Sequence, residues 1–170
     1  MKFFPYEKYY IISPLKPEEV EKKLQASIYV PGIENGLSVG FKYDVYSRKY
    51  FKGFAMYNSF KIEPDINYRN SFAPDITGNI EPYISESRIH VKMKLTGLAI
   101  GFMSIWFGFV IMAILSIIIK DLLAGRFEIR IIQICIFFLF GYCLVLGSFK
   151  YESIRCRRIL LEIFEGEIED

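Results

Sequence analysis

A run of 25 residues without a charged side chain, from Leu95 to Ile119, limits the possible folds of this chain more than any other feature. As a helix it would be ~37 Å long, enough to cross the hydrocarbon core of a bilayer. A second uncharged run, Ile131 to Phe149, has 19 residues and would be ~28 Å long. We therefore expect two transmembrane helices that form a hairpin.

Charge is unevenly distributed along the chain. Residues 1–94 hold 14 Lys or Arg and 11 Asp or Glu, although the whole chain is 52% hydrophobic. A domain of that size could not cover two helices that are apolar on every side, which disfavours two buried helices in a soluble core. The net charge of +2 is too small, and the cations too scattered, to indicate a nucleic-acid partner.

Residues 1–94 predict a β-rich domain with one helix near its start. Pro17, followed by two glutamates, predicts a helix over Pro17–Ala26. Lys16 is a poor cap, so Ser13 or a longer turn is expected to start this helix. Stretches rich in Tyr, Phe, Val and Ile follow, broken by Gly, Asn and Pro, as in antiparallel sheets. The expected strands are 38–46, 49–62, 66–69, 76–84 and 88–95.

The last of these strands leads directly into the first uncharged run. Its apolar residues alternate with cations, so one face is apolar and the other cationic. The cationic face is either solvated or in contact with lipid headgroups. Together with arginines after the second run, the candidate headgroup contacts are Arg88, Lys92, Lys94, Arg155, Arg157 and Arg158.

The segment after the second run predicts a separate amphipathic helix with an acidic tail. Its apolar residues recur at helical spacing from Cys156 to Phe164. This helix is expected either to lie in the membrane interface or to fold back over the sheet. The expected organisation is a soluble domain (1–94), a hairpin (95–149, with helices 95–119 and 131–149) and a tail (150–170). The fold class is thus an α+β membrane protein.

The distribution of cations predicts the orientation of the hairpin. The connecting loop, Lys120–Arg130, carries three cations, whereas the flanks at the other ends of the two runs carry seven. The positive-inside rule then places the N and C termini in the cytoplasm.

The chain resembles an uncharacterised family of small bacterial membrane proteins with a β-rich N-terminal domain and two transmembrane helices. The resemblance lies in Tyr68-Arg69-Asn70-Ser71-Phe72 followed by Pro74 and Gly78, and in the segments Ser13–Val20 and Phe149–Ser153. It implies the architecture and a bacterial inner membrane, and it implies no activity.

Tyr68, Arg69, Asn70 and Ser71 form the densest group of hydrogen-bonding side chains and are the candidate ligand loop. The alternative is a structural turn whose side chains bond the local backbone. His90 is the only histidine and is expected to be solvated or interfacial. Asp65 and Asp75 could pair but are better explained as turn residues. We expect no catalytic, cofactor-binding or metal site, and no enzyme.

Three functions compete on this pattern. The first is a membrane-anchored binding or sensing module, because no linker separates the domain from the first run. The second is a homo-oligomeric pore or channel-like membrane effector, with a second copy or another membrane protein as partner, since small residues in the first run would let helices approach closely. A membrane lipid enzyme ranks third because neither run holds an ionisable residue. The small residues are Gly97, Gly101, Ser104 and Gly108.

Overall fold

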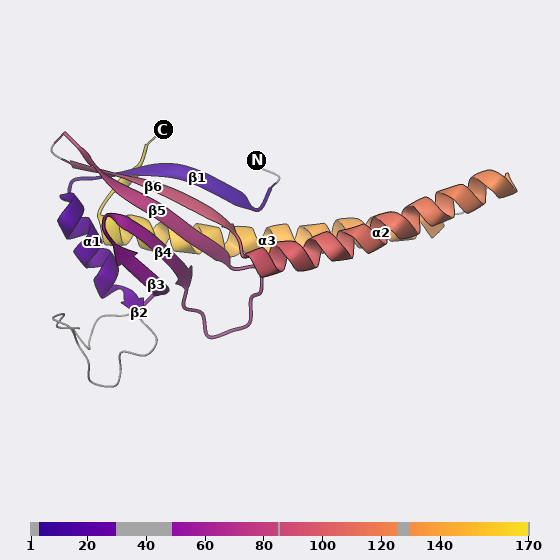
Figure 1. Cartoon of the computed structure of the whole chain (residues 1–170), viewed down its shortest axis with the longest axis horizontal. Coiled ribbons are helices and arrows are strands. Elements are labelled where there is room, and N and C mark those ends of the chain that lie inside the picture. Colours follow the sequence, from indigo (N-terminus) through magenta and orange to yellow (C-terminus); the bar gives the residue numbers. More distant parts are fainter. Residues whose placement is uncertain (1–3, 30–48, 85, 126–129, 170) are drawn as a thin grey trace.

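The computed structural model describes residues 4–29, 49–84, 86–125 and 130–169 and has an α+β fold (Figure 1). Among these residues, seven strands form one sheet in the order β2-β3-β4-β5-β6-β1-β7, and every neighbouring pair is antiparallel except β2 and β3. The strands are β1 (Tyr6–Ser13), β2 (Ile28–Tyr29), β3 (Phe51–Met56), β4 (Ser59–Pro64), β5 (Pro74–Tyr83), β6 (Glu86–Leu95) and β7 (Glu167–Ile168). The helices are α1 (Pro17–Ala26), α2 (Gly97–Ala124) and α3 (Arg130–Phe164).

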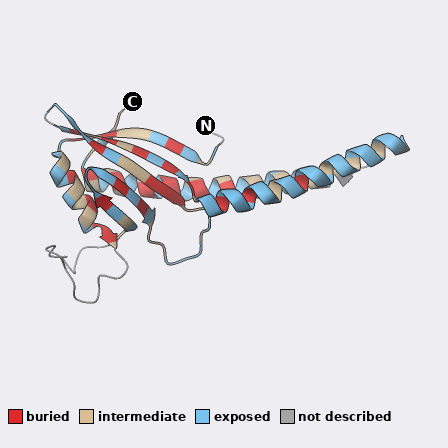
Figure 2. Ribbon diagram, viewed as in Figure 1, coloured by how far each residue is buried: buried red, intermediate tan, exposed pale blue. Residues whose placement is uncertain are grey.

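One face of the sheet is covered by α1 and by the second half of α3 (Figures 1 and 2). The core lies between these layers because apolar residues alternate along the strands and recur every three or four residues in the helices. Among the described residues, no helix covers the other face of the sheet. The largest apolar core side chains include Ile11, Leu24, Phe51, Ile62, Ile89, Phe149, Leu160 and Phe164.

The strand predictions succeed where alternation is regular. The prediction over 88–95 is confirmed by β6, and 76–84 corresponds to most of β5. The predicted strand 49–62 is instead the hairpin β3–β4, which turns at Tyr57 and Asn58 with φ values of 54° and 57°. No strand forms over 66–69, and 38–46 lies outside the described residues.

Strand β1 was not predicted, and its inward side chains explain the omission. Glu7, Tyr9, Ile11 and Ser13 point toward the helices, so only one of the four inward residues is aliphatic. Polar residues at inward positions hide the alternation that identifies a strand. The strand is nevertheless paired along its whole length with β6.

The prediction of α1 is confirmed, but its start differs from the expectation. Lys16 is the N-cap, and its backbone N–H donates to the Glu19 carboxylate at 3.2 Å. Ser13 is the last residue of β1, and its hydroxyl donates to the carbonyl of Phe164 at 2.5 Å. The serine therefore joins β1 to the end of α3 instead of capping α1.

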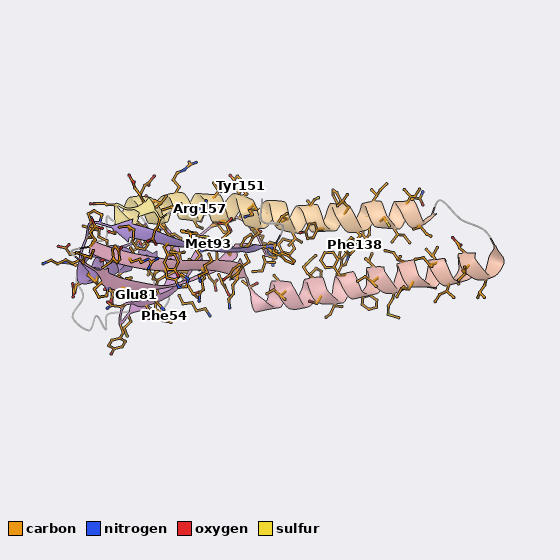
Figure 3. All side chains as sticks on the ribbon, turned by 90° about the horizontal axis from the view of Figure 1, so that it is seen from above. Phe54, Glu81, Met93, Phe138, Tyr151 and Arg157 are labelled. Carbon is orange, nitrogen blue, oxygen red and sulfur yellow. The ribbon has the colours of Figure 1, made fainter. Side chains whose placement is uncertain are left out.

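Both α2 and α3 are long and apolar enough to cross a membrane, by length and composition. They lie side by side as a hairpin that projects from the sheet (Figures 1 and 3). The prediction of a separate helix after residue 149 is wrong, because α3 continues without a break from Arg130 to Phe164. No Pro and no Gly follow Gly147 until Gly166, so nothing in this stretch would end the helix.

The two long helices contact each other through large side chains from α2. Trp106 packs against Phe137, and Phe107 packs against Phe138. A Cβ atom at Gly141 would overlap the Trp106 ring, so α3 needs a glycine there. The predicted small-residue stripe faces elsewhere, since a Cβ at Gly97, Gly101 or Gly108 would meet no atom within 4 Å and Ser104 is exposed.

Candidate functional site

The loop between β4 and β5 contains the predicted ligand residues. Asn70 stabilises the loop itself, because its side-chain oxygen accepts a hydrogen bond from the Phe72 N–H at 3.0 Å. Asp65 begins the loop and forms an ion pair with Lys52 at 2.7 Å. For Asn70 the structural-turn explanation therefore holds, and Asp65 serves the loop rather than pairing with Asp75.

Tyr68 reaches out of this loop to α3. Its hydroxyl donates a hydrogen bond to the Glu152 carboxylate, and Arg155 donates to the same hydroxyl at 3.3 Å. The hydrogen bond to Glu152 raises the pKa of Tyr68, since the bond favours the protonated phenol. The loop and the helix are thus linked through one tyrosine.

An open groove of about 440 Å³ lies between this loop and α3. It runs past Phe149, the position where the second uncharged run gives way to charged residues. Ser71, the fourth residue of the predicted loop, does not line it. The lining residues are Tyr68, Arg69, Asn70, Gly147, Ser148, Tyr151 and Glu152.

Glu152 is the most unusual residue of the groove. It is completely buried, and its second carboxylate oxygen, Oε2, has no hydrogen-bond partner among the described residues. The next residue, Ser153, is also buried, and its hydroxyl likewise has no partner there. Leaving such groups unsatisfied costs about 1–3 kcal/mol each, so a buried polar atom without a partner calls for a ligand or another explanation.

A second buried carboxylate, Glu7 on β1, contacts the same part of α3. It forms ion pairs with Lys150 at 2.5 Å and with Arg157, and the Arg157 guanidinium lies over the Tyr9 ring at 5.1 Å. Burial alone would raise the pKa of Glu7, but the hydrogen bonds from Lys150 and Arg157 outweigh it and lower that pKa. This cluster attaches β1 to α3 immediately after the uncharged run.

The structure places the six candidate headgroup cations in different environments. Arg88 lies seven residues before the end of β6 and forms an ion pair with Glu169 at 2.7 Å, and Arg157 is bound to Glu7. Arg155 contacts Tyr68. Lys92, Lys94 and Arg158 are exposed and have neither an ion pair nor a side-chain hydrogen bond among the described residues. Contact with lipid stays a prediction for all six.

Two other sequence candidates, His90 and Asp75, lie in strands of the sheet. His90 stacks on Tyr10, with ring centroids 4.7 Å apart. Asp75 is the second residue of β5 and is paired with Lys94, so the prediction that it is a turn residue is wrong. It lies beside Glu63, where burial and the Asp75 carboxylate raise the pKa of Glu63. Within the described ranges, no three His, Cys, Asp or Glu side chains are grouped to hold a metal ion.

Sequence reasoning missed Glu7 and Glu152, the two buried glutamates. The signal for Glu152 was its spacing, because it lies three residues after Phe149 and four before Cys156 on one continuous helical stripe.

Comparisons with known proteins yield no match among family models, curated proteins or solved structures.

Proposed function

We propose that the protein is an integral membrane protein anchored by the hairpin of α2 and α3. Only 11% and 6% of the residues in the most apolar stretches of these helices are buried, whereas the core helix of a soluble protein is mostly buried. From Arg130 to Phe149, α3 would extend ~30 Å at the usual helical rise, which matches the hydrocarbon thickness of a bilayer. Lipid is the natural cover for such a surface.

The same proposal includes an orientation. Because β6 leads into α2 and α3 returns to the sheet, the sheet lies at one end of the hairpin (Figure 1). The seven cations at this end, against three at the other, favour the cytoplasmic side for the sheet and both termini. The resemblance to small bacterial membrane proteins supports an inner membrane. Alkaline extraction, and labelling of single cysteines at Ser59 and Ala124 with an impermeant reagent, test both points.

We further propose that the protein is a membrane-anchored binding module whose ligand site is the groove between the β4–β5 loop and α3. The observation that carries the proposal is the buried Glu152 carboxylate, which lines the groove and has one oxygen without a partner. Such an oxygen would accept a hydrogen bond from a cationic donor, and the rings of Tyr68 and Tyr151 suit an ammonium group.

The position of the groove supports a lipid headgroup as the source of that ammonium. The groove lies where the uncharged run of α3 ends, which is the level of the headgroups if the hairpin spans the bilayer. Arg69 lines the same groove and could contact the headgroup phosphate. A bound headgroup would change the Tyr68–Glu152 hydrogen bond, so binding would alter the contact between the loop and α3.

The test is thermal unfolding of the full chain in neutral detergent with short-chain phosphatidylethanolamine or phosphatidylglycerol. Phosphatidylethanolamine should raise the Tm of the parent and of Glu162→Gln, an exposed site on the same helix. Glu152→Gln should lose that response. Equal responses to both lipids, or a full response by Glu152→Gln, would contradict the proposed ligand site.

A homo-oligomer is the second candidate, on one specific observation. Gly97, Gly101, Ser104 and Gly108 lie on the side of α2 that α3 leaves open. Close packing of a second α2 against this stripe would bury it. Cross-linking of single cysteines at Gly101 in native membranes would detect such a pair.

A further inference from the structure

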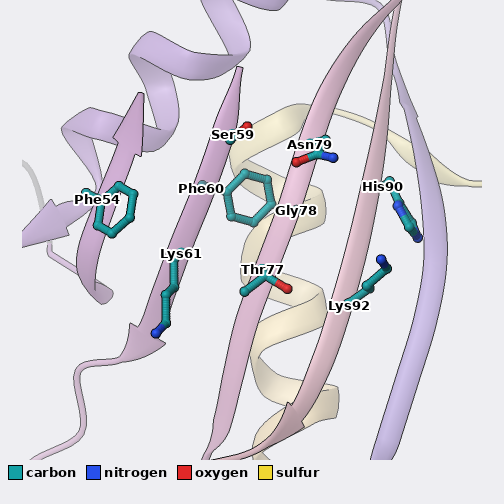
Figure 4. Close-up of a pocket in the computed structure, with 9 residues that line it drawn as sticks. All are labelled: Phe54, Ser59, Phe60, Lys61, Thr77, Gly78, Asn79, His90 and Lys92. Carbon is teal, nitrogen blue, oxygen red and sulfur yellow. The ribbon is translucent and has the colours of Figure 1, made fainter. Parts of the chain in front are cut away.

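The uncovered face of the sheet carries a straight row of side chains from five neighbouring strands. The strand pairing places Phe54 beside Lys61, Lys61 beside Thr77, and Thr77 beside Lys92. Lys8 on β1 completes the row opposite Lys92. Figure 4 shows the four side chains from β3 to β6, with α3 passing behind the strands.

The row contains three lysines and no carboxylate. Lys8 and Lys92 are direct cross-strand partners, an arrangement that destabilises a sheet when both residues carry the same charge. None of the carboxylates in the described residues forms an ion pair with Lys8, Lys61 or Lys92. The folded protein therefore keeps a repulsion that a bound anion would relieve.

The same face is hollowed at the centre of this row. The hollow has a volume of about 230 Å³ and is centred on β5, between Lys61 and Lys92. Because neighbouring strands are about 4.8 Å apart, the backbones of these two lysines are about 10 Å apart, and both ammonium groups can reach an anion above Thr77. Phe54, Ser59, Asn79 and His90 complete the rim (Figure 4).

His90 supplies an independent sign of an absent partner. Its Nε2 atom is buried and has no hydrogen-bond partner among the described residues, while the ring is held in place against Tyr10. Burial, then Lys92 and Lys8, lower the pKa of His90, so this histidine is neutral in the free protein at neutral pH. A neutral imidazole with its proton on Nε2 would donate to an anion in the hollow.

We propose that this hollow is a binding site for the phosphate group of a small phosphorylated molecule. The phosphate lies over Thr77, held by the Lys61 and Lys92 ammonium groups and the Thr77 hydroxyl, with His90 Nε2 as a further donor. Phe54, which is 58% exposed at the edge of the row, contacts the body of the ligand. The site does not depend on the groove at Glu152, which is lined by other residues.

The phosphate could come from a free solute or from an anionic lipid headgroup, and the experiment separates the two. Pyrophosphate is titrated into the full chain in neutral detergent, and Tm and the His90 ring signals in NMR are followed. The titration is repeated in nanodiscs of phosphatidylcholine with and without phosphatidylglycerol. A response to pyrophosphate that phosphatidylglycerol abolishes assigns the site to lipid phosphate, and a response that persists assigns it to a solute.

The decisive variant, Lys92→Gln, should lower the affinity for pyrophosphate and raise the thermal stability of the free protein. Lys92→Gln should bind pyrophosphate about tenfold more weakly, because a charge-assisted hydrogen bond is lost. Without ligand it should unfold at a higher temperature than the parent, because the Lys8–Lys92 repulsion is removed. Lys22→Gln removes the same charge from the exposed side of α1 and should bind like the parent.

Thr77→Val gives a second variant that leaves every charge in place and should also weaken binding. Three results would overturn the proposal: no response of the parent to pyrophosphate, equal affinity of the parent and Lys92→Gln, or an unchanged His90 signal at saturation.

Discussion

The two halves of α3 belong to one unbroken helix but have opposite surroundings. From residue 130 to 148, large apolar side chains such as Ile136, Leu139 and Phe140 are exposed. From Phe149 to Phe164, one stripe is completely buried against the sheet and the opposite side is charged (Figure 2). In residues 149–164, the covered half, only one stripe is apolar, and the sheet of the same chain packs on it. In residues 130–148, the uncovered half, all sides are apolar and something other than this chain has to cover them.

Buried and half-buried polar side chains gather at the boundary between the halves. Lys150, Glu152, Ser153 and Arg157 follow Phe149 within two turns, and Glu7 meets them from β1. The change of surroundings therefore coincides with the groove that we propose as the ligand site.

The largest expected effect is on the covered half. Leu160→Asp would put a charge into the core between α3 and the sheet, at a cost of about 4 kcal/mol. Denaturant unfolding of the full chain in detergent measures it. Ile154→Asp, at an exposed position of the same half, should cost far less. Similar losses in the two variants would mean that the covered half is not packed as described.

The second largest effect on stability is expected at the ion cluster of Glu7, Lys150 and Arg157. Glu7→Gln leaves Lys150 and Arg157 without their carboxylate and should lower the free energy of unfolding by about 3 kcal/mol at neutral pH. The exposed Glu18→Gln is the control.

The cluster also predicts a pH dependence. The folded pKa of Glu7 is lowered, so its contribution to stability is present above the ordinary glutamate pKa of 4.5 and is lost as the pH falls through the folded pKa. Glu7→Gln should flatten the Tm curve below pH 4.5. An unchanged acid limb in this variant would show that other carboxylates control acid unfolding.

Substitutions in the uncovered half of α3 should affect membrane insertion and leave the packing of the sheet unchanged. Leu139→Asp, near the middle of this half, should raise the apparent free energy of insertion by about 3 kcal/mol. The fraction of chains that resist alkaline extraction measures the loss. Leu139→Ala is the control. If both variants remain fully inserted, Leu139 does not face lipid.

The smallest effect compares two glycines of the hairpin. Gly141→Ala should cost about 2 kcal/mol of hairpin stability, because its methyl group overlaps Trp106. Gly101→Ala meets no atom within 4 Å and should leave the hairpin unchanged. Förster transfer between probes on α2 and α3 follows separation of the helices. A loss with Gly101→Ala but not Gly141→Ala would reverse the assigned contact faces.

The sequence was sufficient for features that depend on regular patterns. The uncharged runs, the alternation in β6 and the Pro17 helix start each follow from a local rule. The groove was half predicted, since Tyr68, Arg69 and Asn70 were found but their partner Glu152 was not. Pairing between residues 84 positions apart in the sequence has no local signature. The second transmembrane helix was predicted to end at Phe149 because hydropathy falls there, but α3 continues to Phe164. Hydropathy indicates the surroundings of a helix and not its length.

The arrangement of the sheet also sets an order for biosynthesis. Residues 150–164 close the core over β1 and β5, and β7 pairs with β1, so the sheet is incomplete until both hairpin helices have been synthesised. At about 5–20 residues per second, strands β1 to β6 wait several seconds on the ribosome with an uncovered apolar face. A chain that ends at Leu95 would leave exposed the apolar face that α3 covers, so the first part of the chain completes its core only after the hairpin has been made.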